Sequence, residues 1–138
     1  VKRTTAQLKE LKEQIDMLEH AWKHKDSVEY EKADMRFHLL IVDFTENERL
    51  SSIFKSIVLQ SQLIFPILSM HSMELIKIAF GENLPDNEES INHGLIYKAI
   101  CDKEEDRAEN YVREHVASSY SLIKNFLRFR NSLSNEND

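Results

Sequence analysis

Residues 8–22, LKELKEQIDMLEHAW, decide the fold class of this chain. Their apolar residues recur at steps of three and four, which is the spacing of one face of an amphipathic α-helix. The residues of this stripe are Leu8, Leu11, Ile15, Leu18 and Trp22. The same period continues along almost the whole chain, so the sequence predicts helices packed against one another by apolar faces.

The composition supports an all-α fold. The 138 residues include only two glycines and two prolines, whereas a sheet protein of this size needs many turn residues at regular spacing. The length is typical of a single domain, and short connections between helices favour antiparallel neighbours. We therefore predict one domain over residues 1–138, an antiparallel helical bundle of about six helices.

Capping signals and helix breakers set the expected boundaries. The predicted helices cover about 5–23, 27–45, 48–68 with a kink or an end at Pro66, 70–80, 86–100 and 103–130, and the polar tail from 131 is expected to fray. Asp26 followed by Glu29 resembles a capping box, and Asp102 followed by Glu105 repeats that spacing. Asn47 is the expected N-cap of the third helix.

Charge and cysteine content exclude several function classes. The net charge is −6 and the pI about 5.5, with no basic stripe, so this segment is not expected to bind nucleic acid itself. The single cysteine, Cys101, excludes an intrachain disulfide. The sequence has neither a signal peptide nor an apolar run of membrane-spanning length, which favours the cytoplasm and no membrane partner.

Four polar residues lie at positions where a bundle favours apolar ones. Asp34 and His38 are four residues apart and share one helix face. His93 shares a face with apolar residues of its own helix, and His115 interrupts the apolar stripe of the last one. Three imidazoles and one carboxylate suit zinc, nickel, cobalt or manganese. Periodicity alone also allows each of them to be a hydrogen-bonded core residue.

Two runs of sequence resemble the FadR C-terminal (FCD) domain of GntR-type transcription regulators. Residues 34–40, DMRFHLL, with 45–50, TENERL, resemble the family signature D-x-x-F-H, small-Gly-Asn, Leu. Residues 93–100, HGLIYKAI, followed by Asp102, Ala108 and His115, resemble its H-x-x-I-x-x-A-I, D-x-x-x-A, H. The resemblance covers nearly the whole chain. Glu46 departs from it, because the family usually has glycine there.

The resemblance implies a metal-dependent sensor. In metal-binding members the aspartate and three histidines hold a divalent ion, most often zinc, whose coordination a small organic acid completes. Carried over, the ligands are Asp34, His38, His93 and His115. The resemblance also implies a homodimer that binds operator DNA through a winged helix-turn-helix domain, which would precede Val1 together with the family's first helix. Residues within a turn of these ligands are candidates for effector binding: Tyr97, Arg113, Ser118 and Ser119.

Other function classes fit less well. Metal-free members of the family bind acyl-CoA or other ligands, and a ligand-free dimerisation module would leave the position of His115 unexplained. A helical-bundle metalloenzyme of the di-iron type needs Glu-x-x-His pairs, and a zincin needs His-Glu-x-x-His; the sequence has neither, so no enzyme activity is expected. His20 and His24, at the polar end of the first helix, are interpreted as a solvated pair.

Overall fold

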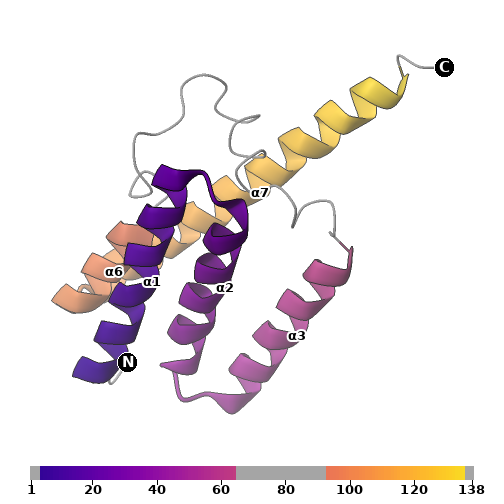
Figure 1. The fold of residues 1–138 in the computed structure, drawn as a ribbon. Coiled ribbons are helices and arrows are strands. Elements are labelled where there is room, and N and C mark those ends of the chain that lie inside the picture. Colours follow the sequence, from indigo (N-terminus) through magenta and orange to yellow (C-terminus); the bar gives the residue numbers. More distant parts are fainter. Residues whose placement is uncertain (1–3, 65–92, 136–138) are drawn as a thin grey trace. The chain divides into compact units, whose positions relative to one another are not determined.

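The computed structural model of the chain describes residues 4–64 and 93–135. These residues form five helices and no strand (Figure 1), which confirms the all-α fold. The helices are α1 (Thr5–His24), α2 (Ser27–Asp43), α3 (Glu48–Ile64), α6 (His93–Asp102) and α7 (Glu105–Asn135). The chain divides into two compact units after Ser72. The predicted helix over 70–80 and the expected start of the next one at 86 lie outside the described residues.

The core of the first unit lies between α1 and α2, which run side by side (Figure 1). The apolar stripe predicted from residues 8–22 is buried from Leu11 onward, while Leu8 is half-buried. The Trp22 and Tyr30 rings meet near the α1–α2 turn, with centroids 6.0 Å apart. Other buried residues of this core are Leu11, Ile15, Leu18, Ala21, Ala33, Phe37, Leu40 and Phe44.

The α1–α2 turn is capped differently from the prediction. The Asp26 carboxylate accepts a hydrogen bond from the Glu29 N–H at 2.9 Å, so Asp26 is the N-cap of α2 as expected. The reciprocal half of the predicted capping box is absent, because the Asp26 N–H donates to the Ala21 carbonyl at 2.9 Å. The Glu29 carboxylate lies instead beside His20. A complete capping box does form at Thr4 and Gln7, ahead of α1.

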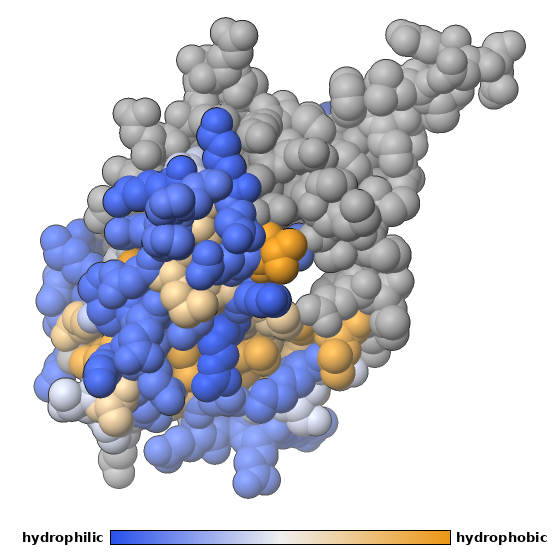
Figure 2. Space-filling view, in the orientation of Figure 1, coloured by the Kyte–Doolittle hydropathy of each residue, from blue (hydrophilic) through white to orange (hydrophobic). Residues whose placement is uncertain are grey.

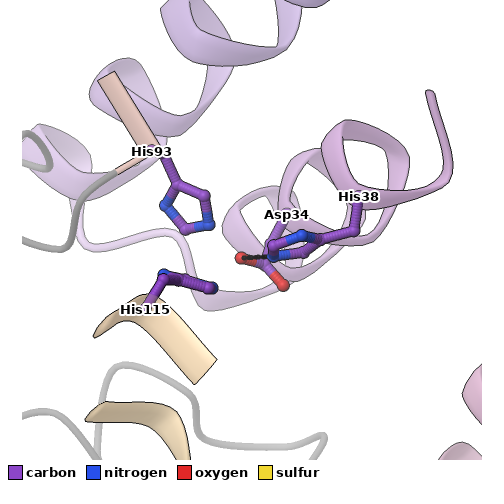
Figure 3. A group of neighbouring side chains, drawn as sticks. All are labelled: Asp34, His38, His93 and His115. Carbon is purple, nitrogen blue, oxygen red and sulfur yellow. Dashed lines mark ion pairs between the residues drawn. The ribbon is translucent and has the colours of Figure 1, made fainter. Parts of the chain in front are cut away.

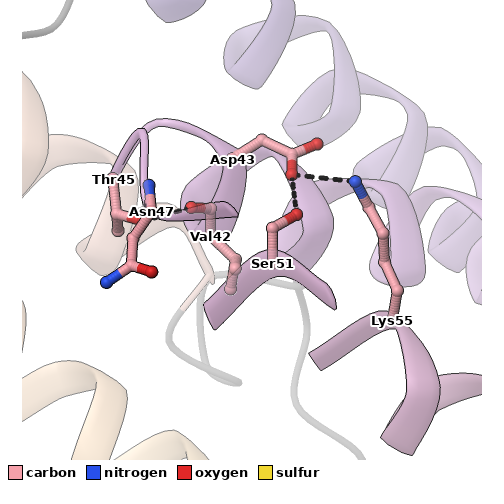
Figure 4. A network of polar contacts seen from close by, with 6 residues as sticks. All are labelled: Val42, Asp43, Thr45, Asn47, Ser51 and Lys55. Atoms are coloured by element: carbon pink, nitrogen blue, oxygen red, sulfur yellow. Dashed lines mark hydrogen bonds and ion pairs between the residues drawn. The ribbon is translucent and has the colours of Figure 1, made fainter. Parts of the chain in front are cut away.

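A polar network joins α2 to α3 (Figure 4). Asn47 caps α3 as predicted, with its side-chain oxygen accepting from the Leu50 N–H at 3.0 Å. The Asp43 carboxylate accepts hydrogen bonds from the Ser51 hydroxyl and from Lys55 Nζ, the latter at 3.0 Å. In the turn between the helices Glu46 has φ 54°, in the left-handed region. This turn therefore depends on side-chain hydrogen bonds and on one strained residue.

In the second unit α6 packs against α7. The predicted cap at Asp102 is wrong, because Asp102 is the last residue of α6 and Lys103 takes the left-handed conformation with φ 62°. The carbonyl of Glu104 accepts the first hydrogen bond of α7, from the Ala108 N–H at 2.9 Å. The last helix also continues past its predicted end, through the polar residues up to Asn135.

The face drawn in Figure 2 is mostly hydrophilic where its residues are described, with smaller apolar areas between the polar ones. None of the helices in the described ranges is both long and apolar enough to cross a membrane. Charged residues make up 30% of the sequence, and most of those that the structure describes are exposed.

Candidate metal centre

The first half of the candidate site is a carboxylate–imidazole pair on α2. Asp34 Oδ1 lies 3.6 Å from His38 Nε2, and both side chains are half-buried (Figure 3). Their neighbours Ala33 and Phe37 are fully buried, and the Phe37 ring meets the His38 ring edge-on at 5.5 Å. The packing of α2 therefore fixes the helix face on which the pair lies and leaves the pair at the edge of the core.

The second half is a pair of imidazoles contributed by α6 and α7. The His93 and His115 ring centroids are 4.4 Å apart, with the ring planes tilted by 58°. His93 is only 1% exposed, so its ring nitrogens need polar partners from the protein or from a ligand. One turn further along α7, the Ser119 hydroxyl donates to the His115 carbonyl at 3.0 Å. The site therefore includes a buried histidine beside a second one.

The donor set suits a divalent transition metal. Asp34, His38, His93 and His115 each offer one ligand atom, and within residues 4–64 and 93–135 they form the group that could hold a metal ion. Neutral imidazole suits zinc, nickel and copper, and a carboxylate adds one negative charge to the set. These are the four residues predicted from the sequence.

The residues expected to contact an effector have varied surroundings. Ser119 and Tyr97 are half-buried, one turn beyond His115 and His93 respectively. Ser118 is exposed. Arg113 is exposed as well, and its guanidinium donates two hydrogen bonds to the Glu109 carboxylate, at 2.9 and 2.7 Å. Their role in effector binding stays a prediction.

Sequence reasoning did not single out the groove beside the α2–α3 turn. Its volume is about 830 Å³, and its lining includes Asp43, Ser51 and Lys55. The Ser51 hydroxyl, followed by Lys55, holds the pKa of the Asp43 carboxyl below its ordinary value. The sequence contains only a weak indication of this groove, because Asp43 and its partners are ordinary surface residue types that only the turn brings together.

A comparison with models of known protein families identifies a match. The family model of the FCD domain matches residues 1–118, which contain all four candidate ligands. No curated protein and no solved structure matches the chain. The match ends within α7, which continues to Asn135.

Proposed function

Because the chain belongs to the FCD domain family, the effector-binding domain of GntR-type transcription regulators, we propose that it senses a small organic acid through a bound divalent metal ion. The ligands of the ion are Asp34, His38, His93 and His115. FCD domains are regulatory, not enzymes, and the proposed ion has a sensing role.

The pairing of His93 with His115 carries the proposal. A buried imidazole needs polar partners, and the donor atoms of the four side chains lie within 4.8 Å of one another, close enough to bind one ion. Two imidazoles alone are too few for a stable zinc site, which takes three or four protein ligands. The Asp34–His38 pair supplies the two that are missing. With four protein ligands, a metal ion that takes five or six ligands keeps one or two coordination positions for the effector.

In this proposal, some residues bind the metal ion and others contact the effector. The four side chains hold the ion, and the Ser119 hydroxyl, which donates to the His115 backbone carbonyl, lies one turn beyond that ligand. The bound ion supplies a Lewis acid for the carboxylate oxygens of the effector. Tyr97, Ser118, Ser119 and Arg113 are the proposed polar contacts for the rest of the acid. The acid changes the protein's state only as far as it binds two arrangements of the dimer with different affinity.

A homodimer formed through α7 completes the proposed regulator. Val112, Val116 and Tyr120 follow one another at steps of four and are 37%, 59% and 65% exposed, which is an unusual apolar stripe for a helix surface. We assign this stripe to a second copy of the chain. An isologous contact across a two-fold axis uses the same stripe on both copies.

The charge distribution along α7 fits that occupant. Its first turns carry the exposed acids Glu105, Asp106 and Glu109, and its later turns carry the exposed bases Lys124 and Arg128. From Ser118 to Asn135 the sequence has no acidic residue. An antiparallel pair whose axis passes near Val116 sets the acidic start of each helix against the basic part of the other.

The parent protein would bind operator DNA through a winged helix-turn-helix domain outside this chain.

The metal site is tested by the metal content of purified protein. After dialysis against a weak chelator, which removes loosely held ions, we expect elemental analysis to find about one divalent ion per chain. Asp34→Ala and His93→Ala should each lose it, because three remaining ligands from this set hold the ion less tightly. Asp16→Ala, which removes an exposed carboxylate of α1, is the matched control and should retain it.

The effector is tested on the same proteins by thermal unfolding. Lactate, citrate and sugar acids are added to the metal-loaded chain and to His93→Ala. At a hundredfold excess over Kd, a binding acid adds about 2.7 kcal/mol and raises the Tm by roughly 5–11 °C. The shift should be absent in His93→Ala. Unchanged metal content in both ligand variants contradicts the site, and a null screen on metal-loaded protein favours an acyl-chain ligand or none.

A further inference from the structure

A second pair of histidines lies at the end of α1, where the chain turns into α2. The His20 and His24 rings are stacked, with centroids 4.1 Å apart and planes inclined by 28°. Both residues are exposed. The exposure agrees with the solvated pair expected from the sequence, whereas the stacking shows that the two rings are held together one turn apart.

Each imidazole has an oxygen atom close to its Nδ1 atom. His24 Nδ1 lies 2.8 Å from the His20 carbonyl oxygen, which can only accept, so Nδ1 carries the hydrogen. His20 Nδ1 lies 3.4 Å from Glu29 Oε2. A hydrogen on Nδ1 leaves Nε2 as the nitrogen with a lone pair. Backbone carbonyls and carboxylates orient metal-binding histidines in the same way.

The helix ends hold this arrangement in place. Glu29 lies in the first turn of α2, where Asp26 caps its N–H. The buried contact between Trp22 and Tyr30 joins the two helices beside the turn. The C-terminal end of α1 carries partial negative charge, which favours a cation there. All these residues belong to the first unit.

We propose that His20 and His24 form a second metal site, in which both Nε2 atoms bind one late first-row divalent ion and Glu29 orients His20. Two imidazoles one turn apart suit nickel or copper, with water completing the coordination. This site uses none of the residues of the proposed sensor site. Its exposure and smaller ligand set make it the weaker of the two, so the chelator dialysis described above empties it.

The test is a calorimetric titration of the untagged full chain with Ni²⁺, using wild type and His24→Ala. Wild type should bind one more ion per chain than His24→Ala. Both residues are exposed, so the variant is expected to fold, and circular dichroism checks this. Glu29→Gln should retain the second ion with about tenfold weaker affinity, as for other groups that orient a metal ligand. Glu13→Gln, an exposed glutamate elsewhere on α1, should bind like wild type.

Equal stoichiometry and affinity in wild type and His24→Ala overturn the second site. The sensor site fails separately, because its loss follows Asp34→Ala and His93→Ala. If only the sensor proposal is wrong, wild type binds one Ni²⁺ and His24→Ala binds none.

Discussion

Glu46 occupies a position at which the family signature usually has glycine. Its φ of 54° lies in the left-handed region, where a residue with a Cβ is destabilised by about 1–2 kcal/mol. Glycine adopts this conformation without that strain, although its greater freedom in the unfolded chain offsets part of the gain. We expect Glu46→Gly to raise the free energy of unfolding in urea by about 0.5–1 kcal/mol.

The control for this substitution is Glu48→Gly, two residues further on in the first turn of α3. Glycine inside a helix is destabilising by about 1 kcal/mol or less relative to other residues, so this variant should unfold at lower urea concentration. If Glu46→Gly and Glu48→Gly lose stability equally, the claim that the left-handed conformation of Glu46 is strained is wrong.

At the scale of elements, the α2–α3 junction depends on the ionised Asp43 carboxylate. Its pKa is lowered by the Ser51 hydroxyl and by Lys55, so the native state favours the charged form. The stabilisation is therefore complete above the ordinary pKa of aspartate and is lost as the pH falls through the lowered value. Since the carboxylate is partly exposed, the contribution at neutral pH is on the order of 1 kcal/mol.

The measurement compares wild type with Asp43→Asn by urea unfolding. At pH 7 the variant should be less stable, and the difference should shrink as the pH is lowered from about 5 to about 2. Asp16→Asn, which removes an exposed ion-pair partner of Lys12, should show a smaller difference. If the difference in the free energy of unfolding between wild type and Asp43→Asn does not change with pH, the charge of Asp43 is not what stabilises the junction.

Helices were predictable from the sequence because their signals are local. The stripe from Leu11 to Trp22 and the cap at Asn47 needed only spacing and residue type. The failures have a different cause. Glu29 was expected to complete a capping box, but His20 of the preceding helix competes for its carboxylate. Asp102 stays helical because Lys103 takes the left-handed turn. Neither competition is visible in a periodic pattern.

One part of the candidate metal site was predictable from spacing along the chain, and the other part was not. The spacing of Asp34 and His38 predicted that they share a helix face, because four residues make about one turn. The pairing of His93 with His115 depends on how α6 packs against α7, and spacing along the chain does not encode it. Only the family motifs indicated that pairing in advance. The stacking of His20 on His24 depends on the side-chain conformations at the end of α1, which the spacing of two exposed residues does not predict.

At the scale of the whole molecule, the proposed regulator depends on pairing through α7. Val116→Glu places a carboxylate in the centre of the stripe, where it would be buried against its own symmetry mate. Burying two like charges is costly, so the dimer dissociation constant should rise at least about tenfold, equivalent to about 1.4 kcal/mol. Sedimentation velocity over a range of protein concentrations measures this change.

Val28→Glu is the matched control, because Val28 on α2 is 60% exposed and Val116 is 59% exposed. It adds the same charge at a similarly exposed valine and should leave the dimer intact. The antiparallel arrangement makes a further demand on wild type. Its acidic and basic turns attract one another at the rim of the contact, so the dimer should weaken as salt is raised from 0.05 to about 0.5 M. A dimer that strengthens with salt, or one that tolerates Val116→Glu as well as Val28→Glu, would assign the stripe on α7 to something other than a second copy.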